Sequence, residues 1–526
     1  MLYDGCTLGD ITVRALGRYR ERDAVICGDR RQTYAELRDE VARFVEVFAA
    51  AGLQPGDRIA ILSRNRPEVV GAFCAAYVQG LTLTPLSPHA ADDDLAFVLH
   101  DAGIDCLVVD ETGIGERGAA LARRVESVRE VFTFGAAAFG RSLCECAADV
   151  APQPLRSTAR PELPAVVGYT GGTTGKPKGV IQSQRGMVVA HQMMLAEWDW
   201  PETPRMLLST PLSHAAGVMV LPTLMKGGAV VMLPSFDPVA FLAEIERSAV
   251  NVTFLVPTMI YALLDAAAAG PARRFDSLRT VFYGAAPMAP ERLRQAMAIF
   301  GPVFMQLYGQ TEAPLCISTL RRDEHDLAQP ERLGSCGKPA AGLCVTLLDE
   351  NGREVPLGGI GEICVRGPLV MEAYHRRPEE TAEVFRGGWL HTGDVGRFDQ
   401  DGYLYIVDRC KDLIITGGLN VYPREVESTL ETHPGVAQCA VVGLPDAKWG
   451  EAVTAAVVRR EGHAVTAEEL TGFVRTAKGP LYAPKRVVFI DRLPVTPLGK
   501  PDRNAIRRQL AAEPAPQSQP QLQPQS

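Results

Sequence analysis

The residues most able to do chemistry begin with a glycine-rich loop, Tyr169-Thr-Gly-Gly-Thr-Thr-Gly-Lys-Pro-Lys-Gly179. Glycines let backbone N–H groups come close to an anion, while threonine hydroxyls and lysines add donors and positive charge. The loop is not a Walker A motif, because no glycine is followed five residues later by Gly-Lys-Ser/Thr. It therefore predicts either a flexible turn or a different kind of polyphosphate site. The phosphate-binding residues would be Thr170, Gly171, Gly172, Thr173, Thr174, Gly175, Lys176 and Lys178.

A second motif, Tyr308-Gly-Gln-Thr-Glu312, follows an expected strand. Glu312 could hold Mg²⁺ against phosphate oxygens, because this ion prefers hard oxygen ligands. Thr311 could donate a hydrogen bond to a phosphate, and Tyr308 offers a flat face to a base. Taken alone, the motif is also typical of a turn with a polar end.

Two further positions offer charged groups. Asp394, in His391-Thr-Gly-Asp394, is expected at a strand end, where a carboxylate could accept hydrogen bonds from paired ribose hydroxyls; Arg409 could join it. Lys500 follows Pro494-Val-Thr-Pro-Leu-Gly in an extended loop that could deliver one flexible cation. Such a cation can stabilise charge that develops in a transition state. A turn and a solvated lysine are the structural alternatives.

The order and spelling of these motifs resemble the adenylate-forming enzymes, which comprise acyl-CoA synthetases, adenylation domains of peptide synthetases and firefly-type luciferases. The resemblance covers roughly residues 10 to 510 and is greatest to the ATP-dependent acyl-CoA synthetases. The usual phosphate loop has Ser-Gly where this chain has Gly171-Gly172, which we interpret as a variation. The resemblance implies two steps: a carboxylic acid and ATP form acyl-AMP and pyrophosphate, and a thiol then displaces AMP.

The resemblance also implies roles for individual residues, with Lys411 as the hinge of a rotating domain and Gly417 and Gly418 along a pantetheine tunnel. The catalytic residues would be Lys500, Glu312, Thr311 and His214. The Mg²⁺ ligands would be Glu312 and Thr174. The nucleotide and the thiol substrate would be bound by Gly284, Ala285, Ala286, Gln306, Tyr308, Gly309, Asp394, Arg409, Lys411, Gly417 and Gly418, in addition to the glycine-rich loop.

The expected acid is hydrophobic, and fatty, aryl and polycyclic acids all fit. Peptide-synthetase domains place a carboxylate just after the position of His214, to pair with the amino group of an amino acid. Here apolar residues follow, so a charged amino group would be unpaired at a cost of several kcal/mol. We expect His214 to gate the substrate. The acyl pocket would be lined by His214, Ala215, Gly217, Val218, Ala313, Pro314 and Leu315.

The expected acceptor is coenzyme A, but an acyl-AMP ligase that loads a carrier-protein phosphopantetheine arm uses the same thiol and stays open. A luciferase-like oxygenase shares the fold and also stays open. A non-catalytic nucleotide-binding homologue is disfavoured, because Glu312, Asp394 and Lys500 are all present.

Composition narrows the class of protein. The net charge of −8 argues against non-specific nucleic-acid binding but not against a nucleotide. The twelve cysteines contain no CxxC pair, so local zinc spacing is absent and a cytoplasmic protein with reduced cysteines is expected. No signal peptide and no transmembrane segment are expected, because the most apolar stretch, residues 214–233, is interrupted by Pro222 and Lys226. The resemblance implies a monomer or homodimer.

The predicted fold is α/β. Short apolar strands alternate with amphipathic helices such as residues 34–49, where Leu37, Val41, Phe44, Val45 and Phe48 share one face. The resemblance implies a large N-terminal domain of two stacked αβαβα-type subdomains plus a small β-subdomain, followed by a small, mobile α+β domain. The predicted boundaries are residues 1–408 for the large adenylation domain, 409–412 for the hinge, 413–510 for the rotating domain and 511–526 for a disordered tail.

Overall fold

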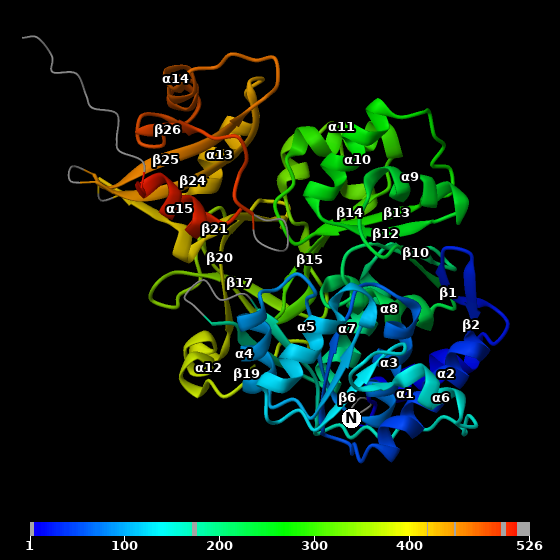
Figure 1. Ribbon diagram of the computed structural model, residues 1–526. Helices are drawn as coiled ribbons and strands as arrows, with labels where there is room; N and C mark the ends of the chain where they lie inside the picture. Colours follow the sequence, from blue (N-terminus) through cyan, green and yellow to red (C-terminus); the bar gives the residue numbers. More distant parts are fainter. Residues whose placement is uncertain (1–4, 171–175, 418, 447–448, 496–500, 513–526) are drawn as a thin grey trace, which may run out of the picture. The chain divides into compact units, whose positions relative to one another are not determined.

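A computed structural model describes residues 5–170, 176–417, 419–446, 449–495 and 501–512. The chain divides into two compact units (Figure 1). The first comprises residues 1–392 and 396–406, and the second comprises residues 393–395 and 407–526. Among the described helices, none is both long and apolar enough to cross a membrane.

The first unit contains a nine-stranded sheet in the order β16-β15-β14-β13-β12-β10-β11-β1-β2. Its central strands are parallel, whereas β2 at one edge and β15 and β16 at the other pair antiparallel. The strands are β1 (Asp23–Cys27), β2 (Arg30–Thr33), β10 (Arg205–Leu208), β11 (Ala229–Met232), β12 (Val252–Leu255), β13 (Thr280–Gly284), β14 (Phe304–Gln310), β15 (Ala313–Leu320) and β16 (Lys338–Pro339).

An eight-stranded sheet follows the order β19-β9-β8-β4-β3-β5-β6-β7. Its strands are β3 (Arg58–Leu62), β4 (Thr82–Leu86), β5 (Cys106–Val109), β6 (Glu130–Thr133), β7 (Arg141–Ser142), β8 (Pro164–Thr170), β9 (Lys178–Ser183) and β19 (Ala373–Tyr374).

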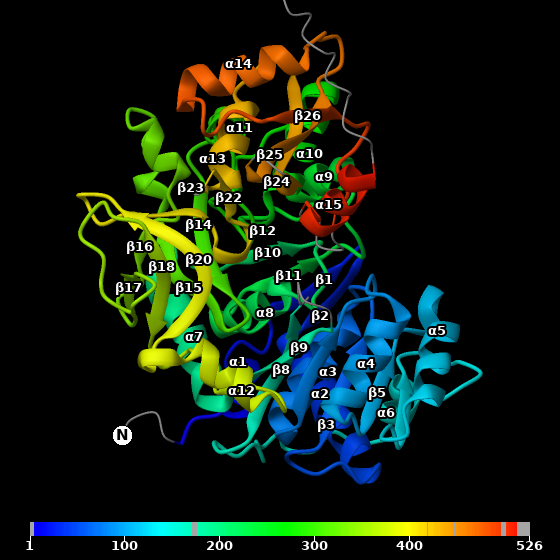
Figure 2. The ribbon, with the colours of Figure 1, turned by 90° about the vertical axis from the view of Figure 1, so that its left-hand side faces the viewer.

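Helices cover both faces of these two sheets and so build a layered unit. Helices α9, α10 and α11 pack on one face of the nine-stranded sheet (Figure 1). Helices α4 and α5 pack on the outer face of the eight-stranded sheet (Figure 2). The largest core cluster includes residues of α1, α2, α3, α7 and α8 and of both sheets. The helices of this unit are α1 (Leu8–Arg18), α2 (Tyr34–Ala50), α3 (Pro67–Gln79), α4 (Asp92–Ala102), α5 (Glu111–Arg124), α6 (Leu143–Ala148), α7 (Gln184–Glu197), α8 (Ala215–Met225), α9 (Pro238–Arg247), α10 (Pro257–Ala269), α11 (Pro290–Phe300) and α12 (Pro378–Val384).

The strand sequences explain this layering. On β3, Ile59 and Ile61 join the central core, while Ala60 and Leu62 join the outer one. Successive side chains point to opposite faces of a strand, so a continuous apolar run buries both faces at once. The predicted α/β architecture with two stacked subdomains is therefore confirmed.

The helix predicted at residues 34–49 is α2, which begins after Thr33 in a capping box with Glu36. Its predicted core face is buried except for Val45, which is half-buried, and Val47 is buried in addition. The apolar stretch at residues 214–233 forms α8 and β11; Pro222 lies inside the helix, and Lys226 follows its last residue.

A four-stranded sheet, β17-β18-β20-β21, forms the predicted β-subdomain. Its strands are β17 (Cys344–Leu348), β18 (Gly361–Arg366), β20 (Leu390–Phe398) and β21 (Leu404–Arg409). The short 3-10 turns are η1 (Arg322–Glu324), η2 (Pro330–Gly334), η3 (Arg386–Gly388) and η4 (Cys410–Asp412). The last of these occupies most of the predicted hinge.

The second unit has its own sheet and core. Its strands are β22 (Ile414–Thr416), β23 (Leu419–Val421), β24 (Val436–Asp446), β25 (Gly450–Arg459) and β26 (Arg486–Phe489). One core cluster contains α13 (Pro423–Glu431) and α14 (Ala467–Lys478), and another contains α15 (Arg503–Ala512). The predicted tail begins at Ala511, whereas α15 continues to Ala512, because Leu510 still anchors its last turn to the core. Residues 513–526 lie outside the described ranges.

Candidate active site

The glycine-rich loop leaves from the open end of an antiparallel hairpin. Strands β8 and β9 pair as far as Thr170 and Lys178, so the loop starts directly after their last pair. Thr170 and Lys178 are half-buried, and Lys176 is exposed. The predicted phosphate ligands between them lie outside the described residues; they are Gly171, Gly172, Thr173, Thr174 and Gly175.

The second motif forms a tight hairpin turn. Gln310 pairs with Ala313 across β14 and β15, so Thr311 and Glu312 are the turn residues. The sequence predicts that the motif follows the strand, whereas its first three residues belong to β14, where Tyr308 is buried. Glu312 is buried at the turn, and Thr311 is exposed.

A short strand that sequence reasoning missed joins these two motifs. Tyr374 of β19 pairs with Val180 of β9, next to the glycine-rich loop. Its hydroxyl donates a hydrogen bond of 2.8 Å to Oε1 of Glu312. The Lys178 ammonium nitrogen lies 5.2 Å from the centre of the Tyr374 ring, within the range of a cation–π contact. One tyrosine therefore contacts both the candidate phosphate lysine and the candidate metal carboxylate.

Further hydrogen bonds fasten the same turn. The Gln182 side chain on β9 donates one of 2.6 Å to the Thr311 carbonyl oxygen. The Met371 N–H donates one of 2.8 Å to the Glu312 carbonyl oxygen. The turn is thus tied to the phosphate-loop hairpin on one side and to the segment leading into β19 on the other.

The carboxylate of Glu312 suits a hard cation such as Mg²⁺. Burial, and next the negative charge of Glu312, raise the pKa of the Tyr374 hydroxyl, which therefore stays protonated and donates. That donor is neutral, and among the described residues no arginine, lysine or histidine forms an ion pair with Glu312. A neutral donor does not offset the charge of a buried carboxylate, which favours a cation as the missing partner.

Backbone strain is found at the predicted adenine and acyl positions. Ala285 has φ +65° and Leu315 has φ +56°, both in the left-handed region that side chains other than glycine rarely adopt. Such residues often occur at functional sites, where the surrounding structure maintains the strain. Gly284, at the end of β13, has no room for a side chain, because a Cβ there would collide with the Leu307 carbonyl oxygen. Beside it, Ala285 is exposed and Ala286 is half-buried.

An unpaired acceptor lies on the neighbouring strand. Within the described part of the chain, Oε1 of Gln306 is buried and makes no hydrogen bond. Gln306 stands opposite Tyr283 in β13, one residue before Gly284, and the half-buried Gly309 follows on the same strand as Gln306. A buried polar atom without a partner is costly, so this amide offers a recognition group for a ligand on this side of the sheet.

The predicted acid-pocket residues come from two segments. His214 precedes α8 directly, and Ala215, Gly217 and Val218 are half-buried in its first turn. Burial lowers the pKa of His214, so the imidazole is neutral at physiological pH. A neutral imidazole fits the predicted gating role better than a charged one. On β15, the residues are Ala313 and Pro314, which are buried, and Leu315, which is half-buried.

The predicted ribose-binding pair belongs to the second unit. Arg409 Nε lies 3.1 Å from Oδ1 of Asp394, so the two residues form an ion pair. The sequence predicts Asp394 at a strand end, whereas it lies inside β20; Gly393, with φ +72°, departs from extended geometry just before it.

The predicted hinge and tunnel residues come next along the chain. Lys411 is exposed in η4, and Gly417, with φ +59°, follows β22. Gly418 and Lys500 lie outside the described residues, so their predicted roles stay predictions.

Most of the chain matches two models of known protein families. Residues 13–375 match the AMP-binding enzyme family, and residues 425–500 match the AMP-binding enzyme C-terminal domain. This chain belongs to the AMP-binding enzyme family.

Relatives of this AMP-binding enzyme align over nearly the whole chain. The Medium/long-chain-fatty-acid–CoA ligase FadD8 of Mycobacterium tuberculosis is 45% identical over 515 residues, which are 95% of this chain and 89% of that protein. The Feruloyl-CoA synthase of an Amycolatopsis species is 38% identical, covering 96% of this chain and 99% of that protein. Among solved structures, the amide bond synthetase McbA from Marinactinospora thermotolerans has a TM-score of 0.89 at 38% identity, covering 95% of this chain and 99% of that one.

Proposed function

We propose that this AMP-binding enzyme is an ATP-dependent acid–thiol ligase. It activates a hydrophobic carboxylic acid as acyl-AMP, releases pyrophosphate and transfers the acyl group to coenzyme A. One observation carries the proposal: Tyr374 joins Glu312 to the strand that bears Lys178. The carboxylate of Glu312, which can bind a cation, thus lies near the strand that leads out of the phosphate-binding loop. A triphosphate with a bound metal ion requires both groups.

In the first step, a carboxylate oxygen of the acid attacks the α-phosphorus of ATP, and the bond to pyrophosphate breaks. Mg²⁺, when bound, would neutralise phosphate charge. Glu312 would hold it with Thr174, while Lys178 and the loop amides bind the phosphate oxygens. Lys500 would stabilise the charge on the attacking and α-phosphate oxygens. These residues act by positioning and by charge stabilisation, and they form no covalent bond to the substrate.

The rest of the nucleotide would be recognised by polar groups. The buried Oε1 of Gln306 and the strained turn at Ala285 are suited to the adenine side. Asp394 would accept hydrogen bonds from the ribose hydroxyls, with Arg409 orienting its carboxylate.

In the second step, the thiol sulfur attacks the acyl carbonyl carbon, AMP leaves, and the thiol proton passes to solvent. The second unit would rotate about Lys411 between the two steps. A flexible pantetheine arm would pass the backbone at Gly417, whose positive φ disfavours most side chains. A carrier-protein arm presents the same thiol, but the CoA ligases among the relatives favour coenzyme A as the acceptor.

The proposed acid is a fatty or aryl carboxylic acid. The small, apolar residues around His214 and Ala313 provide no charge for an amino group or a second carboxylate. One relative is named for medium/long-chain fatty acids and another for feruloyl-CoA, which carries an aryl acid. Together they support a hydrophobic acid without deciding between the fatty and the aryl kind.

The test is pyrophosphate release from Mg·ATP over a panel of fatty, aryl and polycyclic acids, with and without coenzyme A. Thioester formation is followed by mass spectrometry, and each assay is repeated on Lys500→Ala. Acid-dependent release, a CoA thioester and loss of release in the variant would support the proposal. Release without a CoA thioester would favour a carrier protein, and ATP binding without release for any acid would contradict the ligase.

A further inference from the structure

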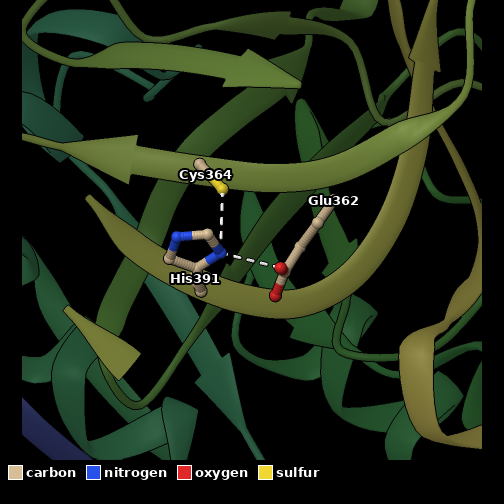
Figure 3. Close-up of side chains that lie close together, drawn as sticks. All are labelled: Glu362, Cys364 and His391. Carbon is tan, nitrogen blue, oxygen red and sulfur yellow. Dashed lines mark hydrogen bonds and ion pairs between the residues drawn. The ribbon is translucent and has the colours of Figure 1, made fainter. Parts of the chain in front are cut away.

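Apart from the candidate active site, a cluster of ionisable side chains lies in the β17-β18-β20-β21 sheet. Glu362, Cys364 and His391 point toward one another there (Figure 3). Cys364 Sγ lies 3.4 Å from His391 Nδ1, and Glu362 Oε2 lies 2.7 Å from the same nitrogen. One potential ligand atom from each residue lies within 4.8 Å of the other two.

The strand geometry explains why these residues meet. Glu362 and Cys364 are two positions apart on β18, so they share one face of the sheet. His391 comes from β20, the neighbouring strand, and the Thr392 hydroxyl donates a hydrogen bond of 2.7 Å to the Ile363 carbonyl oxygen. The three side chains are therefore held on two adjacent strands of one sheet, which gives a rigid frame.

The ligand set is that of zinc. Thiolate, imidazole and carboxylate are its usual protein ligands. Bonds of about 2.3 Å to sulfur and about 2.0 Å to nitrogen place these atoms about 3.5 Å apart in a tetrahedral site. The observed sulfur–nitrogen distance of 3.4 Å matches this value. The carboxylate oxygen is at hydrogen-bond distance from the nitrogen, and its flexible side chain would turn away by about 0.7 Å to admit the ion.

The surroundings would retain a bound ion. Cys364 and His391 are buried, and the Glu362 side chain is 15% exposed, which leaves a path for entry beside the carboxylate. Nη2 of Arg386 lies 2.6 Å from Oε2 of Glu362. Without binding the ion itself, this guanidinium would continue to orient the carboxylate.

We propose that Glu362, Cys364 and His391 form a binding site for Zn²⁺, with solvent as the fourth ligand. This site is separate from the Glu312 carboxylate to which the proposed function assigns Mg²⁺. On binding, the thiol proton of Cys364 is released to solvent. The Nδ1 proton of His391, which faces Glu362 in the metal-free protein, is exchanged through solvent for one on Nε2, so that the Nδ1 lone pair binds the ion. The two negative ligands balance the charge of the ion.

The test uses the full chain, freed of metal with a chelator and then titrated with Zn²⁺ against a fluorescent zinc indicator. Two exposed cysteines, Cys344 and Cys410, are replaced by serine in every sample, because they could bind zinc loosely. The expected result is one zinc ion per chain. Cys364→Ala should weaken binding at least about 100-fold, since even the loss of a ligand's supporting partner costs about 10–100-fold.

A matched control is Cys106→Ala, which removes a thiol that is equally buried, on β5, and should leave zinc affinity unchanged. Cobalt titration adds a second readout, because a thiolate–cobalt charge-transfer band should form in the parent and be absent from Cys364→Ala. If that variant fails to unfold cooperatively, Glu362→Gln decides instead, as it preserves shape but removes the anionic ligand. No zinc binding by the parent, or equal binding by the parent and the variant that folds, would overturn the proposal.

Discussion

Glu312 and Glu362 are two well-shielded carboxylates of the same unit, and they differ in the charge of their partners. Glu312 accepts a hydrogen bond from the neutral hydroxyl of Tyr374. Glu362 contacts the guanidinium of Arg386 and the imidazole of His391. The first carboxylate therefore has its charge available for a cation that is added later, while the second is already compensated and needs a thiolate beside it to attract a metal.

The charge of its hydrogen-bond partners thus determines whether a buried carboxylate is available to bind a metal ion. A neutral donor fixes the direction of the Glu312 carboxylate without neutralising it. A cationic donor such as Arg386 offsets the charge of its carboxylate, so a metal ion needs further ligands such as a thiolate to bind there. Three substitutions separate these two situations, and a fourth, at Glu40, measures the effect of burial on another carboxylate.

The largest effect is expected for Glu312→Gln. The amide keeps the shape and can still accept the Tyr374 hydrogen bond, but it lacks the charge that would hold a metal ion. Acid-dependent pyrophosphate release should fall by about 100-fold or more, in the range seen when one preorganised electrostatic group is removed. Stopped assays at saturating Mg·ATP measure this. A loss below about threefold would exclude Glu312 as the metal carboxylate.

A third carboxylate, that of Glu40, shows how desolvation changes the pKa of a carboxyl group. Burial, reinforced by Glu68, raises the pKa of Glu40 to about 7. Because the folded pKa lies above the unfolded one, this group contributes stability fully below about pH 4.5 and loses it as the pH rises through 7. Relative to Glu40→Gln, the parent should therefore lose about 2 kcal/mol of unfolding free energy between about pH 5 and pH 8. Denaturant titrations at both pH values measure it, and parallel pH profiles would disprove the shift.

Tyr374→Phe should have a smaller effect on catalysis than Glu312→Gln. The ring remains for Lys178, but the donor to Glu312 is lost. A hydrogen bond to a charged group contributes about 1.5 kcal/mol, so pyrophosphate release should fall by about tenfold, and the Mg²⁺ concentration for half-maximal rate should rise. The control is Tyr405→Phe, which removes a similar hydroxyl–carboxylate contact, to Asp399 at 3.1 Å. An equal loss in both variants would contradict a specific role for Tyr374.

The smallest effect is expected for Arg386→Gln, which tests the compensated carboxylate. Arg386 is 54% exposed, so its ion pair with Glu362 is screened by solvent. The unfolding free energy in zinc-free buffer should fall by about 0.5 kcal/mol, as measured by denaturant titration. A loss above about 2 kcal/mol would show that the pair is a major support of the sheet.

Sequence patterns predicted those parts of the site that are contiguous in the chain. The glycine-rich loop, the turn at Glu312 and the apolar run after His214 are each encoded in a few adjacent residues. Strand and helix periodicity predicted an α/β fold, whereas the stacking of two subdomains was implied by the family resemblance. The sequence places Asp394 at a strand end, because a glycine such as Gly393 gives no signal that distinguishes a turn from a continuing strand.

Cross-strand contacts could not be predicted in this way. Tyr374 lies 62 residues from Glu312, in a strand of two residues that is too short to show alternation. Cys364 and His391 are 27 residues apart, so the local spacing of cysteines does not indicate their contact. The first contact joins a turn of one sheet to a strand of the other, and the second depends on the register between β18 and β20; one sequence reveals neither.

The link between the two active-site motifs is tested most directly by a double-mutant cycle between Tyr374→Phe and Glu312→Gln, measured as acid-dependent pyrophosphate release. If Tyr374 acts by orienting the charged carboxylate, its loss should matter little once that charge is absent. The double variant should then be about as active as Glu312→Gln alone, with a coupling energy near the full effect of Tyr374→Phe. Independent, multiplicative losses would contradict the claim that this tyrosine joins the two motifs into one active site.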